Sequence, residues 1–453
     1  SNYASGHGGG IFVDKGSEAN FENVTFDQNV AGDRGGALYR WAGQSAVGNC
    51  SFTNNLSVTY GGAVYTQGTA NSPAFISIEN TLFESNTADI SGGAIASSGY
   101  YDSGYIPAYA YIRIGDPNSA QKTGCVFRQN TAEGVGSSVG QGGAIYFDEL
   151  NTSDYTYVLD SLFEDNFAEV GGGAIYCNKT FCVFMNSRII GNAVNSNGGG
   201  LELENSTYVL KNCIIDGNAA TRGGGIVSNY SANITLFDCV VASNKASAVG
   251  GGISMIEGNV FLYNSILWNN AGSNGTDLAG QVSRYSEAID NVGRYSCIQG
   301  SDGESWSSDG YTWEVLNQDP RFVDLLGSDG IGGTGDEDYR LLATSPCIDA
   351  GFNGGYYGTE YDYTYQNQFL DDPYSADTGY ADSSSGVPLN ITDIGAYEHV
   401  ANELGQPGDK IWNEIQGTTG DYDYTANEHW LPESPVGADR AVIVGKPGES
   451  QGF

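Results

Sequence analysis

Five acidic residues lie between glycines in the stretch DLLGSDGIGGTGDED, which spans residues 324–338. They are Asp324, Asp329, Asp336, Glu337 and Asp338. Ca²⁺ binds hard oxygen ligands on a tightly turning backbone, and like charges held this close are costly without a cation. The loop lacks the helix-flanked pattern of an EF-hand. The sequence therefore makes Ca²⁺ the expected cofactor and these residues its ligands, with a solvated acidic loop as the alternative.

A second acidic set, near insertions between repeats, is the best candidate for catalysis: Asp148, Glu149, Asp160 and Glu164. Carboxylate pairs, or Ca²⁺ with a basic residue, carry out general acid–base chemistry in polysaccharide-cleaving enzymes. We find no basic cluster that would face these carboxylates, and a solvated acidic face explains them better. The sequence also shows no zinc spacing, nucleophile elbow or phosphate-binding loop. We therefore predict no catalytic residue.

Tyrosines dominate the insertion SSGYYDSGYIPAYAYIRIG, which spans residues 97–115. They are Tyr100, Tyr101, Tyr105, Tyr109 and Tyr111. Exposed tyrosine makes a contact surface for sugars or for another protein at a low cost in side-chain entropy. The insertion is thus a candidate contact surface, and the alternative is that these rings pack against the flank of the protein.

A repeat must position these residues, because an apolar residue, two variable residues and an asparagine recur nine times in residues 1–275. The asparagines are Asn29, Asn55, Asn86, Asn130, Asn166, Asn192, Asn218, Asn244 and Asn270. Successive copies lie 26 residues apart wherever no loop is inserted, as from 29 to 55 and from 166 to 192. Gly-Gly and a small or aliphatic residue follow most copies. Such a period predicts one supersecondary unit per repeat.

The segments between the glycines and the asparagines are short and rich in β-branched and aromatic residues, which favours strands over helices. Three short strands and three turns per repeat predict one rung of a right-handed parallel β-helix. The expected fold class is therefore all-β, with a β-helix followed by a C-terminal β extension. The apolar residues should stack as the core, the asparagines as a hydrogen-bonded ladder, and Gly-Gly should form a corner that excludes a Cβ atom.

The eight cysteines include two candidate disulfide pairs, one placed by the repeat and one by a short turn. Cys213 and Cys239 occupy the same column on adjacent rungs, about 4.8 Å apart, within the range for a disulfide. Cys177 and Cys182 flank a short turn that a second bridge could close. The alternative is that the cysteines are small buried residues with free thiols.

Residues 1–275 resemble the polymorphic outer-membrane protein repeats of bacterial surface proteins, which carry Gly-Gly-Ala-Ile and Phe-x-x-Asn in each rung. Residues 264–399 resemble the C-terminal region of β-helix proteins of the choice-of-anchor Q type, through RYSCIQG, NQDPRFVD, SPCIDAG and ITDIGAYEH. The second resemblance implies a bridge between Cys297 and Cys347, which lie in two of these words. Both resemblances imply a secreted or surface-attached protein.

Three parts of the chain follow from these patterns. Residues 1–275 are the repeated rungs, and residues 276–400 are the choice-of-anchor Q-like part of the β-helix. Residues 401–453 are similar to bacterial adhesin repeats and are expected to begin a further small β module.

The charge balance limits the partners, because 54 acidic and 18 basic side chains give a net charge of −36. This charge repels nucleic acid and anionic membrane surfaces. The sequence also has no apolar run long enough for a transmembrane helix. Cations and neutral polymers such as carbohydrate are the expected partners.

Asn2 stands where a ladder residue would stand, in a first rung whose edge is open, and open strand edges recruit other strands. We therefore expect copies of this chain to associate head to tail as a homopolymer, with the alternative that the chain is a fragment of a longer protein. The resulting hypothesis is a noncatalytic extracellular or cell-surface structural protein, either a self-assembling filament subunit or an adhesin rod. The alternative is a secreted polysaccharide lyase or glycoside hydrolase of the β-helix type.

Overall fold

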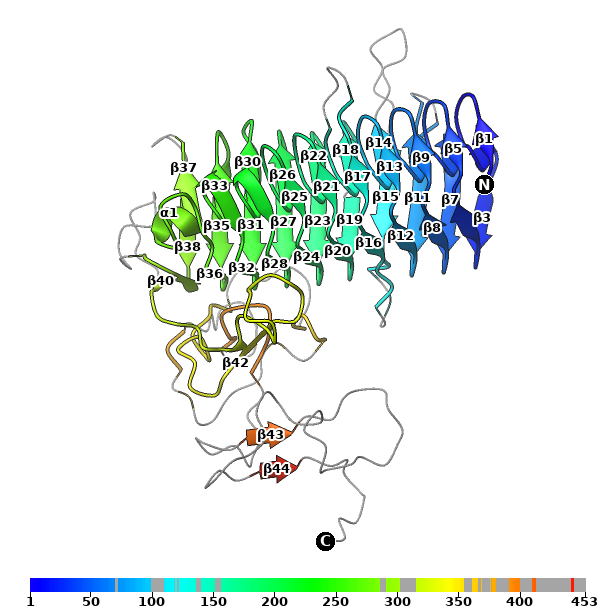
Figure 1. Cartoon of the computed structure of the whole chain (residues 1–453). Coiled ribbons are helices and arrows are strands. Elements are labelled where there is room, and N and C mark those ends of the chain that lie inside the picture. The colour runs from blue at the N-terminus through cyan, green and yellow to red at the C-terminus, as the bar shows by residue number, and fades with distance from the viewer. Residues whose placement is uncertain are drawn as a thin grey trace, which may run out of the picture.

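The computed structural model describes residues 1–69, 72–98, 110–117, 119, 122–135, 140–150, 156–285, 291–301, 315–353, 361–365, 368, 375, 377–379, 391–399, 410–412 and 441–443. Up to residue 298 they form a rod of stacked rungs, in which the chain passes through four parallel sheets in turn (Figure 1). Parallel crossover connections of this kind are right-handed. The predicted right-handed parallel β-helix is therefore confirmed.

The first two sheets flank the Gly-Gly corner. In the described residues sheet A contains β1 (Tyr3–Ala4), β5 (Val30–Ala31), β9 (Leu56–Ser57), β13 (Thr87–Ala88), β17 (Thr131–Ala132), β21 (Phe167–Ala168), β25 (Ala193–Val194), β29 (Ala219–Arg222) and β33 (Lys245–Val249). Sheet B contains β2 (Ile11–Val13), β6 (Leu38–Trp41), β10 (Val64–Gln67), β14 (Ile95–Ser98), β18 (Ile145–Asp148), β22 (Ile175–Asn178), β26 (Leu201–Glu204), β30 (Ile226–Asn229), β34 (Ile253–Met255) and β37 (Val282–Arg284).

The other two sheets complete each rung. Sheet C contains β3 (Ala19–Glu22), β7 (Gly43–Gly48), β11 (Ala74–Glu79), β15 (Ala110–Ile114), β19 (Thr156–Leu159), β23 (Cys182–Met185), β27 (Thr207–Lys211), β31 (Asn233–Phe237), β35 (Asn259–Tyr263) and β38 (Asn291–Arg294). Sheet D contains β4 (Thr25–Asp27), β8 (Ser51–Thr53), β12 (Leu82–Glu84), β16 (Val126–Arg128), β20 (Leu162–Glu164), β24 (Arg188–Ile190), β28 (Ile214–Asp216), β32 (Val240–Ala242), β36 (Ile266–Trp268), β39 (Ser296–Ile298) and β40 (Val315–Leu316).

Each rung from β1 to β36 has four strands, so the expectation of three was wrong. The strand that the sequence did not reveal is the short strand of sheet A between the ladder asparagine and Gly-Gly, such as β21. The strands of sheets C and D are separated by a corner residue that has a positive φ in most rungs. Asparagine and aspartate adopt this left-handed conformation more easily than most residues. They recur at this corner as Asn23, Asn49, Asn80, Asp160, Asn186, Asn212, Asp238 and Asn264.

The core runs along the rod axis as files of identical or similar side chains. Phe26, Phe52, Phe83, Phe127 and Phe163 stack with ring centroids 4.5, 4.9, 4.8 and 4.7 Å apart. Aliphatic residues continue this file in the later rungs and are fully buried. The stacked core predicted from the repeat is confirmed.

The asparagine ladder lies in the turn between sheets D and A. The Oδ1 atom of Asn166 accepts hydrogen bonds from the backbone N and the Nδ2 of Asn130, at 3.0 and 2.9 Å. Asn166 in turn donates in the same way to Oδ1 of Asn192, at 2.9 Å for both bonds. Equivalent bonds join every successive pair from Asn2 to Asn270, so the predicted ladder and its register are confirmed.

The Gly-Gly corner requires glycine at both positions. Gly172 has a φ of +60°, which strains residues with a side chain. A Cβ atom on Gly173 would lie 2.1 Å from the carbonyl oxygen of Gly199 in the next rung. The predicted role of these glycines is therefore confirmed.

The prediction of disulfides was wrong, because all eight cysteines have free thiols and are buried in the structure. Cys213 and Cys239 belong to a file in which serine and threonine serve equally well. The backbone N of Cys213 donates to Sγ of Cys239 at 3.4 Å, and Sγ of Cys239 donates to the carbonyl of Phe237 at 3.1 Å. In neighbouring rungs the hydroxyl of Ser161 makes the same two kinds of bond.

The other two predicted cysteine pairs are also unbonded. Cys177 and Cys182 lie in the core with their sulfur atoms 3.5 Å apart, at hydrogen-bonding distance. Sγ of Cys297 donates to the backbone carbonyl of Gln318 at 3.1 Å, while Cys347 packs nearby in a second apolar cluster. Burial raises the pKa of Cys177 and Cys239, which keeps these thiols protonated.

The rung pattern continues past residue 275, where the helix α1 (Leu278–Gln281) precedes β37, β38 and β39. Gln281 of α1 takes the place of the next asparagine, because its Oε1 accepts from Nδ2 of Asn270 at 2.8 Å. Beyond β40, the strands β41 (Phe322–Asp324) and β42 (Asp338–Leu341) pair antiparallel, and β43 (Lys410–Trp412) pairs in parallel with β44 (Ala441–Ile443). No helix within the described residues is long and apolar enough to cross a membrane.

Replacing Asn166 by alanine should lower the free energy of unfolding by about 3 kcal/mol, because buried donors and acceptors of two neighbouring rungs lose their partners. Urea unfolding followed by circular dichroism measures this loss. Asn195→Ala is the control, since Asn195 is exposed and bonds only to Glu169 through its side chain. An equal loss in both variants would contradict a structural role for the ladder.

Candidate functional site

The chain after β40 returns along the outer face of sheet D (Figure 1). We call the described residues 317–353, 361–365 and 391–399 the strap. Ile214, Val240 and Ile266 point outward from sheet D and pack with apolar residues of the strap. The strap residues in this cluster are Phe322, Tyr339, Leu341, Cys347, Ile348, Ala350, Ile394 and Ala396. The strap therefore covers a second, smaller apolar core outside the rod.

Asparagines at the corner between sheets C and D hold the backbone of the strap. Nδ2 of Asn212 donates to the carbonyl of Tyr361 at 2.7 Å. Asn264 makes two bonds with Phe352, donating to its carbonyl at 3.1 Å and accepting from its N–H at 2.7 Å. The same left-handed corner that shapes the rung thus presents amides to the strap.

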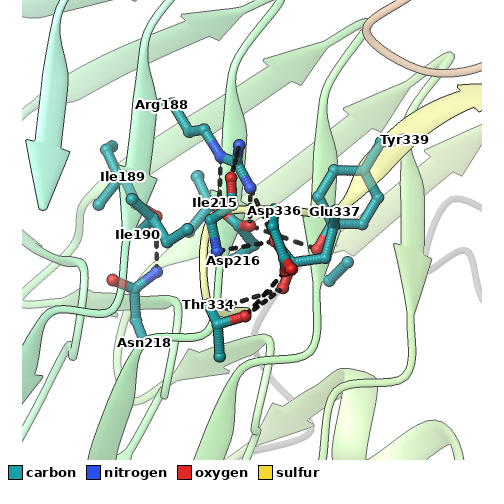
Figure 2. Close-up of polar contacts among 12 residues, drawn as sticks. Arg188, Ile189, Ile190, Ile215, Asp216, Asn218, Thr334, Asp336, Glu337 and Tyr339 are labelled. Atoms are coloured by element: carbon teal, nitrogen blue, oxygen red, sulfur yellow. Dashed lines mark hydrogen bonds and ion pairs between the residues drawn. The ribbon is translucent and has the colours of Figure 1, made fainter. Parts of the chain in front are cut away.

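A buried charge cluster joins the strap to the rod, as Figure 2 shows. Nη2 of Arg188, on β24, donates to Oδ2 of Asp216 at 2.6 Å and to Oε2 of Glu337 at 2.9 Å. The two acidic side chains have no exposed surface, and Arg188 is 17% exposed. The hydroxyl of Tyr339 also donates to Asp216, at 3.3 Å. We call these four residues the Arg188 cluster.

The Arg188 cluster has one cation for two carboxylates. Burial raises the pKa of Asp216 to about 6, while the Arg188 charge and its hydrogen bond act against this shift and the charge of Glu337 adds to it. Burial alone would lower the pKa of Arg188, but the charge and hydrogen bond of Asp216 outweigh it and raise that pKa. The guanidinium therefore stays charged, and Asp216 is the group that titrates near neutral pH.

Three of the predicted Ca²⁺ ligands accept hydrogen bonds from their own loop. Oδ1 of Asp324 accepts from the backbone N–H groups two and three residues on, at 3.1 and 2.9 Å. Oδ1 of Asp329 accepts from the N–H two residues on at 2.7 Å. Oδ2 of Asp336 accepts from the N–H and the hydroxyl of Ser328, and Oδ1 accepts from the hydroxyl of Thr334. These bonds stabilise the tight turns of the loop.

The other two predicted ligands pair with arginines. Glu337 belongs to the Arg188 cluster, and Asp338 pairs with Arg340. In the part of the chain that the structure describes, no three His, Cys, Asp or Glu residues are grouped as a metal site would need. Ca²⁺ binding by this loop stays a prediction.

A second candidate region is a row of tyrosines on the outer face of sheet B. Tyr39 and Tyr65 stack with centroids 5.5 Å apart, and Tyr146 and Tyr176 stack at 5.4 Å. Tyr60 fills the space between the two pairs, at 6.3 Å from Tyr65 and 5.9 Å from Tyr146. Tyr39, Tyr65 and Tyr176 are 5% exposed or less, and their hydroxyls bond within the protein. Tyr60 and Tyr146 are the partly exposed members of the row.

Carboxyl groups follow the tyrosine row along the same face. The hydroxyl of Tyr176 donates to Glu204 at 2.8 Å, and that of Tyr146 donates to Asp148 at 3.2 Å. Glu202 is 4% exposed and accepts one bond, from Nδ2 of Asn197 at 3.4 Å. Burial raises the pKa of all three carboxyls, most strongly that of Glu202. The face therefore carries acidic groups that can hold a proton.

Glu202 lies close to Gly171 of the preceding rung and forms a pair with Glu204 on its own strand. A Cβ atom on Gly171 would lie 1.9 Å from Oε2 of Glu202. Leu201 and Leu203 face the core, so Glu202 and Glu204 point to the same outer face, with Cα atoms about 6.6 Å apart.

The acidic set singled out in the sequence does not form one site. Asp148 lies on sheet B with the tyrosine row, and Glu149 pairs with Lys179. Asp160 lies at the corner between sheets C and D and accepts from the hydroxyl of Tyr365. Glu164 lies on sheet D.

The predicted tyrosine contact surface is described only at Tyr111. Tyr111 lies on β15, half-buried, opposite Phe75 of the preceding rung. The other four tyrosines, Tyr100, Tyr101, Tyr105 and Tyr109, fall outside the described residues. The contact surface stays a prediction.

Sequence reasoning missed both the Arg188 cluster and the tyrosine row. The signal for the row was a tyrosine two places after Ala in the phrases that follow Gly-Gly, as in GGALY and GGAIY. Arg188 and Asp216 carried a weaker signal, since each places a charge in a strand of apolar residues. Nothing in the sequence links either of them to Glu337.

Comparison with protein families shows a similarity to a known repeat. The Chlamydia polymorphic membrane protein (Chlamydia_PMP) repeat matches residues 23–39, 49–67, 80–98 and 160–178. Each matched segment includes a ladder asparagine and the Gly-Gly corner that follows it. The predicted resemblance to these repeats is therefore confirmed, and the choice-of-anchor Q resemblance stays a prediction.

The chain was also compared with solved structures and with curated proteins. Among solved structures, a crystal structure of pectate lyase Pel9A is similar with 14% sequence identity and a TM-score of 0.37. The similarity covers 79% of this chain and 88% of that one. None of the curated proteins matches the sequence.

Replacing Arg188 by methionine should destabilise the protein by about 3–5 kcal/mol near neutral pH, because two buried carboxylates lose their cation. Urea unfolding measures this change. Arg128→Met is the matched control, since Arg128 also pairs with a glutamate on sheet D, at 2.9 Å, but both side chains are at least one-third exposed. The control should lose less than about 1 kcal/mol. Equal losses would contradict the role of burial.

Proposed function

We propose that this chain is a noncatalytic structural rod of the cell surface or the extracellular space. The observation that carries the proposal is the unbroken ladder from Asn2 to Asn270, which holds every rung of the rod in one register. A rod of this kind places its outer faces at a distance from its point of attachment. The repeats matched by the Chlamydia polymorphic membrane protein model support a surface location.

An adhesin rod is the more specific form of this proposal. The side chains in the core are nearly the same in every rung, whereas the side chains on the outer faces differ from rung to rung. The outer faces would therefore be the surfaces that recognise a ligand. Tyr60 and Tyr146 of the row, together with Tyr111, are partly exposed aromatic side chains of the kind that bind carbohydrate or protein. The ligand-binding surface and the point at which the rod is attached would thus lie on separate parts of the rod.

Head-to-tail association of copies is part of the hypothesis. At one end of the ladder Gln281 already bonds to Asn270, so a copy that extended the ladder there would have to displace Gln281. Association of copies through the hydrogen-bonding edges of the four sheets would not depend on the ladder.

Glycoside hydrolysis is the second candidate function, and the Glu202–Glu204 pair favours it. A buried carboxyl with a raised pKa can act as a general acid, and a neighbouring carboxylate can assist it. This pair lies beside aromatic side chains, as carbohydrate sites often do.

A turnover assay separates the two functions. We expect no sustained release of reducing or unsaturated ends from neutral or acidic polysaccharides. Release that is abolished in Glu202→Gln, but not in Glu164→Gln on sheet D, would establish a polysaccharide-cleaving enzyme and overturn the proposal; reducing ends would indicate a hydrolase and unsaturated ends a lyase.

Static light scattering over a range of concentration and of Ca²⁺ tests association. We expect the apparent mass to rise with concentration, as head-to-tail association of copies requires. A single monomer mass under all conditions would remove the filament form of the proposal and leave the adhesin rod.

A further inference from the structure

The Arg188 cluster connects two parts of the chain that lie far apart in the sequence. Arg188 and Asp216 belong to consecutive strands of the rod, and Glu337 and Tyr339 belong to the strap. The same nitrogen, Nη2, donates to one oxygen of each carboxylate (Figure 2). Neither carboxylate has exposed surface. With both ionised, the cluster buries one uncompensated negative charge, which is costly away from water.

The surroundings determine which carboxyl takes up a proton. Glu337 also accepts from the backbone N–H groups of Thr334 and Gly335, at 2.6 and 3.0 Å. Backbone N–H groups only donate, so they favour the ionised form of Glu337. Asp216 accepts a second bond from Arg188, from Nε to Oδ1 at 3.3 Å, and its Oδ2 lies 3.3 Å from the Tyr339 hydroxyl. That hydroxyl can turn to accept a bond from a protonated Asp216, whereas the backbone N–H groups at Glu337 cannot. Asp216 is therefore the acceptor of the proton.

We propose that the Arg188 cluster is a proton-operated latch that fastens the strap to the rod. Uptake of one proton from solvent by the Asp216 carboxylate leaves a neutral pair of Arg188 and Glu337 across the interface. Loss of that proton restores two carboxylates on one guanidinium and weakens the attachment of the strap.

The direction of the pH effect follows from the raised pKa of Asp216. A carboxyl whose pKa is higher in the closed state stabilises that state most below its ordinary pKa near 4, and this stabilisation is lost as the pH rises to about 6. Above about pH 6 the attachment should not weaken further through this group.

Other titratable groups face the cluster from the strap. Burial raises the pKa of Tyr363 to about 12 and also raises the pKa of Tyr339 and Tyr397, so these three stay neutral below about pH 8. Asp238 is buried elsewhere under the strap beside Lys211, and burial raises its pKa as well. A variant of Asp216 is therefore needed to show that a change in strap attachment with pH comes from this carboxyl group.

Amide hydrogen exchange across β41 and β42 tests the latch. Protection factors at about pH 5 and about pH 7.5, corrected for intrinsic rates, should differ about tenfold in the unaltered protein, with the lower value at the higher pH. Asp216→Asn, which is neutral at every pH, should show equal protection at both. Glu164→Gln, in the same file of sheet D but two rungs earlier, should keep the tenfold difference.

Two outcomes would overturn the proposal: equal protection at both values of pH in the unaltered protein, or an unchanged difference in Asp216→Asn. If circular dichroism shows that Asp216→Asn does not fold, Glu337→Gln decides instead. This change leaves Asp216 as the only carboxylate for Arg188, so the difference should again disappear, and its persistence would overturn the latch.

Discussion

A buried primary amide with partners only in the adjacent rungs is the constraint on which this fold depends. The side chain of Asn166 is buried; its Oδ1 accepts from Asn130, and its Nδ2 donates to Oδ1 of Asn192 and to the carbonyl of Phe127. A rung displaced along its strands would leave such groups unpaired in two neighbours at once. Insertions are therefore confined to other corners, and all four sheets share the register that the ladder sets.

The repeated inner surface could be predicted from the sequence, and the singular outer contacts could not. The ladder asparagines, the phenylalanine stack and Gly-Gly recur at fixed positions, because each rung meets the same neighbours. The strands of sheet A also recur, but a strand of two residues such as Phe167–Ala168 is too short to show an alternating pattern. The pairing of Arg188 with Glu337 occurs once, over 149 residues, and no periodicity indicates it.

The two ends of sheet D show how one scaffold acquires different surfaces. Where the strap lies, the outward positions hold Ile214, Val240 and Ile266, and they are buried. At the first rungs the same positions hold Thr25 and Ser51, which face solvent to a greater extent. The inner file keeps its apolar character throughout. Substitutions at outward positions can therefore change what the rod binds while the stacked core is retained.

The alignment of hydrogen bonds with the rod axis has a mechanical consequence. Bonds between parallel strands join one rung to the next, so tension along the axis acts on the rungs in series, and within a rung the four sheets and the ladder share the load in parallel. Resistance to pulling is then set by the weakest interface between two rungs and does not increase with the number of rungs. A strap that crosses several interfaces on one side would act as a splint for that part of the rod.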